Sequence, residues 1–104
     1  MTEIIEDGNQ TLVIVHQDMV ASMTGELKNE LKPLVEVGIK ELVIDLTYVE
    51  MIDSTGLGLL ADTYHSLSKV GGKLKVINAS KQICYLIKAV GLGRRFEVRE
   101  AKTQ

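Results

Sequence analysis

The stretch Val49-Glu50-Met51-Ile52-Asp53-Ser54-Thr55-Gly56-Leu57-Gly58-Leu59-Leu60 decides the fold of this chain. It follows Leu42-Val43-Ile44-Asp45-Leu46, a nearly continuous apolar run with the length and branching of a central strand. Beyond it, apolar residues recur at the steps of one buried helical face: Leu57, Leu60, Ala61, Tyr64 and Leu67. The sequence therefore predicts a buried strand, an exit loop and a helix that reaches about Lys69, with Asp53 and Ser54 at the junction.

The N-terminal part predicts a hairpin followed by a helix. Ile4-Ile5 and Leu12–Val15 flank the turn-rich segment 6–10, which indicates two antiparallel strands. A helix is expected from near Ser22, and Pro33 should bend it near Lys32 before it ends by Gly38. Its apolar face is expected to consist of Met23, Leu27, Leu31, Leu34 and Val35.

The C-terminal part continues the alternation of strands and helices. Leu74–Ile77 reads as a strand, and Ser80 is placed to cap a helix that ends at Gly91. The apolar face of that helix is expected to be Ile83, Leu86, Ile87 and Val90. Phe96 and Val98 indicate a short last strand. We therefore predict an α/β fold: a mixed, mostly parallel sheet of four to five strands with an antiparallel edge hairpin, packed by three to four helices.

Length and composition predict one globular domain over residues 1–104. Hydrophobic residues make up 45% and charged residues 25% of the chain, which is typical of a folded protein. The net charge is −2 and no basic stripe is present, so we expect no nucleic-acid partner. No apolar run approaches the roughly 20 residues that span a bilayer, so no membrane insertion is expected. With an acidic N-terminus and the single Cys84, we expect a cytoplasmic protein.

The junction residues Asp53 and Ser54 allow two compatible interpretations. Both are favoured caps for the unpaired N–H groups at the start of a helix. A phosphate on Ser54 would add nearly two negative charges there and so act as a switch. Thr55 is the rival acceptor, because it also carries a hydroxyl at the junction.

The loop before the junction is rich in apolar side chains. We expect Val49 and Ile52 to anchor it, and Tyr48 and Met51 to be partly exposed and available to a partner. The alternative is that such loop hydrophobics are plain core residues, although not all four can point inward.

Gly56 and Gly58 do not form a nucleotide loop, because the required Gly-Lys-Ser/Thr triplet is missing. We expect them to let another backbone segment or a partner come close to the first helical turn.

We expect neither an enzyme nor a bound metal or cofactor. A serine nucleophile needs a positioned base, and the chain offers only His16 and His65. His16 ends a strand. His65 is expected to be an exposed helix residue, roughly 16 Å along the helix from Ser54. No spacing of Cys, His and acidic residues indicates a metal site, and Cys84 is expected to be semi-buried.

Segment 45–54, Asp-Leu-Thr-Tyr-Val-Glu-Met-Ile-Asp-Ser, followed by Thr-Gly-Leu-Gly, resembles the signature of the STAS domain found in bacterial anti-sigma-factor antagonists. Gly71-Gly72-Lys73-Leu74 is similar to the family's turn into its next strand, and Val90-Gly91-Leu92 to the end of its last helix. The likeness covers almost the whole chain. It implies a single STAS domain in which Ser54 is the serine that a partner kinase phosphorylates.

The resemblance also implies partners. Unphosphorylated, the protein would bind a serine kinase/anti-sigma factor of the histidine-kinase-like ATPase superfamily and release whatever that kinase holds. The kinase would end the contact by phosphorylating Ser54 with ATP and magnesium, and a metal-dependent serine phosphatase would restore it. The expected partner-binding residues are Tyr48, Met51, Asp53, Ser54, Thr55, Gly56, Gly58, Asp18 and Val20.

The chain departs from the family at the end of its second strand. Sporulation-type antagonists carry Gly-Glu-Leu-Asp there, whereas this chain has Gln17-Asp18-Met19-Val20, so Val20 replaces the acidic contact residue. Asp18 could take over only if the loop path shifts. A second hypothesis is a constitutive STAS scaffold or accessory subunit of a signalling or lipid-transport complex, in which Ser54 is only a helix cap.

Overall fold

The computed structural model describes residues 2–102, which form a sheet, three α-helices and a 3₁₀ turn. In chain order the elements are β1 (Thr2–Asp7), β2 (Gln10–Val15), α1 (Ala21–Glu36), β3 (Glu41–Asp45), α2 (Ser54–Lys69), β4 (Lys73–Ala79), α3 (Lys81–Ala89), the 3₁₀ turn η1 (Leu92–Arg94) and β5 (Glu97–Glu100).

The five strands lie in the sheet in the same order as in the chain, β1-β2-β3-β4-β5. β1 and β2 form an antiparallel hairpin, and each later strand runs parallel to its neighbour. The predicted fold, a mostly parallel sheet with an antiparallel edge hairpin and three to four helices, is confirmed.

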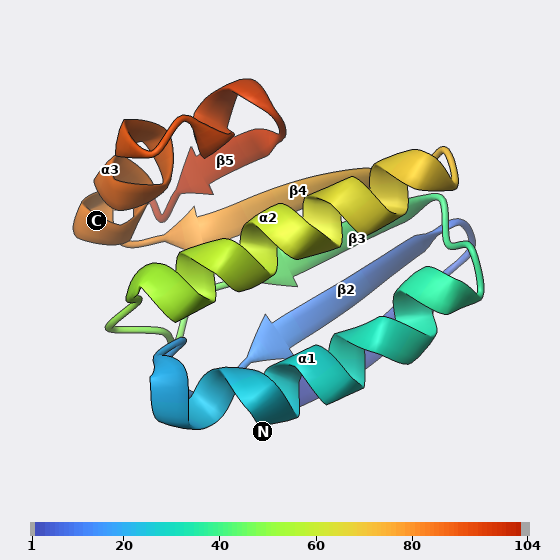
Figure 1. Ribbon diagram of the computed structural model, residues 1–104, viewed down its shortest axis with the longest axis horizontal. Coiled ribbons are helices and arrows are strands. Elements are labelled where there is room, and N and C mark those ends of the chain that lie inside the picture. Colours follow the sequence, from blue (N-terminus) through green and yellow to red (C-terminus); the bar gives the residue numbers. More distant parts are fainter. Residues whose placement is uncertain (1, 103–104) are drawn as a thin grey trace.

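All three α-helices cover one face of the sheet. Each parallel connection moves one strand further in the same direction, and right-handed crossovers then place every helix on the same side. Figure 1 shows α1 and α2 side by side over β2, β3 and β4. The core lies in this layer, where Val13, Ile44 and Val76 meet Leu27, Leu60 and Ile87 with at most 1% of each exposed.

Three local predictions need correction. The turn of the hairpin is only Gly8-Asn9, since Asp7 pairs with Gln10; Gly8 takes the positive φ of 63° that this tight turn requires. Val90 does not belong to the buried face of α3, because it lies just past the end of that helix and is 56% exposed. Cys84 is buried rather than semi-buried, with 4% of it exposed.

The remaining element predictions are close to the structure. α1 begins at Ala21 and continues past Pro33 to Glu36, ending before Gly38 as expected. Pro33 lies in the last turn, where its missing N–H costs α1 one hydrogen bond, to the Asn29 carbonyl, and the helix ends three residues later. The Ser80 hydroxyl caps α3 by accepting from the N–H of Ile83 at 3.2 Å.

Candidate functional site

The candidate site lies at the edge of the sheet where the parallel strands β2 and β3 end. Two loops, 16–20 and 46–53, run side by side there. The Met19 N–H donates to the Met51 carbonyl at 3.0 Å, and the Asp53 N–H donates to the Met19 carbonyl at 3.2 Å. Met19 and Ile52 form a parallel bridge, and both are buried. The loops therefore form one rigid platform from which α1 and α2 start.

Asp53 is the N-cap of α2 and also binds the start of α1. Its Oδ1 accepts from the N–H groups of Thr55 at 2.9 Å and Gly56 at 3.2 Å. Its Oδ2 accepts from the N–H of Ala21 at 3.0 Å, and Val20, the residue before α1, offers no side-chain cap. One carboxylate thus satisfies backbone donors at both helix N-termini.

These contacts lower the pKa of the Asp53 carboxyl below its ordinary value of 3.8. The largest cause is the hydrogen bond from the Thr55 hydroxyl, which lies 2.6 Å from Oδ1. Partial desolvation opposes the shift, and the backbone donors Ala21, Gly56 and Thr55 add to it. Asp53 is therefore ionised at neutral pH and places a fixed negative charge beside Ser54.

Ser54 is the first residue of α2, and its side chain is exposed. Within residues 2–102 its hydroxyl has no hydrogen-bond partner, because Asp53 already caps the helix. Thr55 differs: its hydroxyl donates to Asp53 and lies 3.5 Å from the Thr24 hydroxyl. Of the two hydroxyls at the junction, that of Ser54 is free to react and that of Thr55 is engaged. The capping role that the scaffold hypothesis gave to Ser54 is wrong.

The two glycines of the junction have different surroundings. Gly56 is buried, and a Cβ at this position would lie 2.3 Å from the Met19 carbonyl oxygen. The close approach at Gly56 is therefore internal, to the chain's own backbone, and Gly56 is not part of an exposed surface. Gly58 is exposed, and a Cβ there would meet nothing within 4 Å.

The loop before the junction divides as predicted. Val49 and Ile52 are buried, whereas Tyr48 is 57% and Met51 is 62% exposed. Asp18 holds this loop, because its Oδ1 accepts from the N–H groups of Glu50 at 2.9 Å and Met51 at 3.1 Å. Two exposed apolar side chains therefore flank the junction on a fixed backbone.

Asp18 and Val20, both expected to contact a partner, are only partly exposed. The Asp18 carboxylate accepts hydrogen bonds from the loop amides and so holds the backbone of Met51 in place. Val20 directly precedes α1, close to the Asp53 carboxylate that binds Ala21.

Sequence reasoning missed two contacts around the platform. The ring of Tyr48 stacks on His16 with centroids 4.5 Å apart, and His16 lies 3.1 Å from the Glu3 carboxylate. Asn78 adopts a positive φ of 57° and donates to Asp45, which also accepts from the N–H of Thr47. Asn is enriched several-fold among non-glycine residues with positive φ, and this is the local signal for the conformation of Asn78. The stacking pair joins residues 32 positions apart in the chain and has no local signal.

His65 lies in the middle of α2 and is exposed, as predicted. Within residues 2–102, no group of three or more His, Cys, Asp or Glu side chains is arranged to hold a metal ion. In the same residues, no helix combines the length and apolar character needed to cross a bilayer.

Comparisons with a family model and with known proteins point to the same family. The model of the STAS domain matches residues 2–103. An anti-sigma-B factor antagonist of Bacillus subtilis is 41% identical over 66 residues, which make up 64% of this chain and 60% of that protein. One from Staphylococcus aureus is 32% identical over 75 residues, 72% of this chain and 69% of that protein.

A solved structure supports the same family. The crystal structure of an anti-sigma factor antagonist from Mycobacterium paratuberculosis has a TM-score of 0.85 at 27% identity, and covers 95% of this chain and 84% of that chain. The match to the Bacillus relative spans only 60% of that protein's length.

Proposed function

This chain belongs to the STAS domain family, and from that premise we propose that it is an anti-sigma factor antagonist controlled by phosphorylation of Ser54. Unphosphorylated, it binds a serine kinase/anti-sigma factor of the histidine-kinase-like ATPase superfamily in the cytoplasm. Phosphorylation by that kinase ends the contact, and a metal-dependent serine phosphatase restores it. The relatives named as antagonists support the general role.

The observation that carries the proposal is the state of the Ser54 hydroxyl. It is exposed, it has no hydrogen-bond partner within residues 2–102, and it begins a helix whose first N–H groups are already taken by Asp53. A phosphate on Ser54 could not displace Asp53 without losing these bonds. It would therefore project outward, where a partner would sit.

The proposed partner surface consists of exposed residues around Ser54, chiefly Tyr48 and Met51. Such apolar side chains suit a reversible protein contact. A phosphate with nearly two charges beside them would have to lose its water when the partner binds, and the Asp53 carboxylate adds repulsion toward any acidic partner group. Phosphorylation is therefore expected to weaken binding.

Thr55 is the less favourable acceptor. Its phosphorylation would break the hydrogen bond to Asp53 and bring two anions together at the helix N-terminus. Ser54 avoids both costs.

Partner binding by two Ser54 variants tests the proposal. Ser54→Ala should capture its partner from extracts of the native cells and keep it when ATP and magnesium are added. Ser54→Asp should bind the captured partner at least tenfold more weakly, about 1.4 kcal/mol. Thr55→Ser is the matched control, because it keeps a hydroxyl for Asp53, and it should remain sensitive to ATP. Equal binding by Ser54→Ala and Ser54→Asp would instead favour a constitutive scaffold.

A further inference from the structure

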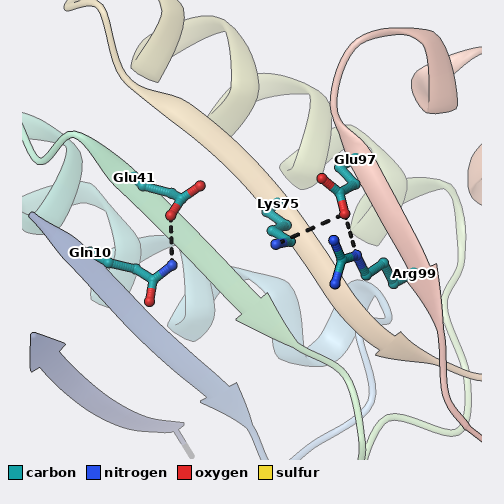
Figure 2. Close-up of polar contacts among 5 residues, drawn as sticks. All are labelled: Gln10, Glu41, Lys75, Glu97 and Arg99. Atoms are coloured by element: carbon teal, nitrogen blue, oxygen red, sulfur yellow. Dashed lines mark hydrogen bonds and ion pairs between the residues drawn. The ribbon is translucent and has the colours of Figure 1, made fainter.

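The face of the sheet turned away from the helices carries side chains in ordered rows. Side chains alternate between the two faces along each strand, and paired residues on neighbouring strands point to the same face. Leu12, Val43 and Lys75, which are paired across β2, β3 and β4, therefore lie together on this face. Figure 2 shows Gln10, Glu41, Lys75, Glu97 and Arg99 standing on it, with the helices behind the strands. We call this surface the open face. Within residues 2–102 no helix covers it.

The centre of the open face is aliphatic. Leu12, Ile14 and Ile77 are half-buried, and Ile5 on the edge strand is 49% exposed. Val43, on the middle strand, is only 5% exposed because these neighbours crowd around it. An apolar centre on an uncovered sheet face is a feature of interaction surfaces.

The charges on the open face are divided between its two halves. The strand register shows which charged residues lie on this face. The charged residues that β1, β2 and β3 place there are all acidic: Glu3, Asp7, Glu41 and Asp45. β4 and β5 contribute three cations, Lys73, Lys75 and Arg99, and one carboxylate, Glu97, which contacts both Lys75 and Arg99. On this face β1 and the middle strand β3 are therefore acidic, and β4 and β5 together have a net positive charge.

We propose that the open face binds a second copy of this chain. Two copies packed face to face must be related by a two-fold axis that lies in the plane between them. An axis along the strands, near β3, places the acidic β1 of each copy over β5 of the other and the aliphatic β2 over the basic β4. Glu41 and Asp45 of β3 then lie close to the axis, beside β4 of the partner. An axis across the strands would oppose like charges. The charge division therefore selects the first arrangement, which is the aligned packing usual for two sheets. This proposal does not depend on the role of Ser54.

The size of the face indicates a weak dimer. Five strands at about 4.8 Å spacing and six residues at about 3.3 Å rise give a footprint of roughly 24 by 20 Å. That is below the roughly 800 Å² per partner of a standard stable interface, so we expect a weak, reversible dimer.

Charge-reversed variants test the proposal by sedimentation velocity between about 5 and 500 μM, the range that brackets such a weak dimer. The wild-type chain should dimerise, and added salt should weaken the dimer. Glu3→Lys/Asp7→Lys and Lys73→Glu/Lys75→Glu should each raise the dimer Kd at least tenfold. An equimolar mixture of the two variants should form a heterodimer.

The matched control is Glu26→Lys/Lys69→Glu, which reverses exposed charges on α1 and α2 and should dimerise like the wild type. Circular dichroism should show that every variant is folded. A wild-type chain that stays monomeric throughout this range would overturn the proposal. So would a mixture of folded variants that forms no heterodimer, or a control that loses the dimer as well.

Discussion

At the first turn of α2, Asp53 caps the helix and the neighbouring Ser54 does not. Asp53 accepts hydrogen bonds from Ala21, Thr55 and Gly56 and so joins the N-termini of α1 and α2. Ser54, released from capping, keeps an exposed and unbonded hydroxyl within the described part of the chain. The neighbouring cap carboxylate therefore leaves the serine hydroxyl without a structural role in the helix.

The lowered pKa of Asp53 gives a prediction of pH dependence. Because the carboxylate form is favoured in the folded state, its contribution to stability is complete above pH 3.8 and is lost as the pH falls through the lower folded pKa. Asp53→Asn should therefore be less stable than wild type at about pH 7, and the difference should shrink by about pH 3. Urea unfolding at both pH values measures it. A difference that stays constant or grows on acidification would contradict the assigned cause.

The same arrangement predicts that Ser54 itself contributes little to stability. Its side chain is exposed and does not cap the helix, so Ser54→Ala should change the free energy of unfolding by less than about 0.5 kcal/mol. Urea unfolding checks this. A loss of about 1 kcal/mol or more would mean that the Ser54 hydroxyl caps the helix after all.

At the scale of elements, α2 and the loop 16–20 are in contact through Gly56. Gly56→Ala should destabilise the fold by about 2 kcal/mol or more, because its Cβ would overlap the Met19 carbonyl and the Ile52 side chain. Gly58→Ala is the matched control in the same helix. It meets nothing within 4 Å and should stabilise α2 by about 0.5–1 kcal/mol. Thermal or urea unfolding of both variants should give shifts of opposite sign.

The loop 46–53 depends on Asp18. Asp18→Ala removes the acceptor for the N–H groups of Glu50 and Met51. Hydrogen exchange of these two amides, followed by NMR, should become faster, while amides in β3 stay protected. Partner binding should weaken as well, since Met51 would no longer be held in one position. Unchanged exchange at Glu50 and Met51 would show that the buried Val49 and Ile52 are sufficient to fix the loop.

Much of this element structure could be predicted from sequence, because it is encoded locally. The apolar run 42–46 and the helical spacing from Leu57 to Leu67 identify β3 and α2. Of the two interpretations of the loop before α2, the structure confirms the one in which Val49 and Ile52 are buried and the other two apolar side chains are exposed. Val90 was misplaced because the apolar pattern continues past the end of α3.

The contacts that join distant segments could not be predicted. Three contacts link segments more than 30 residues apart in the chain: Asp53 with Ala21, Asp18 with Glu50, and Gly56 with Met19. The same limit applied to the choice between Asp53 and Ser54 as the cap, since both residue types cap helices well.

At the scale of the whole molecule, the sheet and its helices separate two surfaces. The Ser54 junction lies where the strands end, and the open face lies on the side away from the helices. The Ser54 side chain makes no hydrogen bond to any other residue in 2–102. A charge placed on it should therefore affect partner binding and leave the fold unchanged.

NMR can check this local action. In a ¹H–¹⁵N spectrum, Ser54→Asp should shift resonances in the loop 46–53 and the first turns of α1 and α2, and leave those of β4, β5 and α3 in place. Shifts spread across the whole sheet would show that the switch works through a change of conformation.

The central claim is that Ser54 is the site at which this protein is switched. Intact-mass and fragment mass spectrometry of the protein recovered from its native cells tests it most directly. The account predicts a form with a single added phosphate that maps to Ser54 and is absent from the Ser54→Ala variant. A phosphate on Thr55, or none under any growth condition in which the partner is still bound, would contradict it.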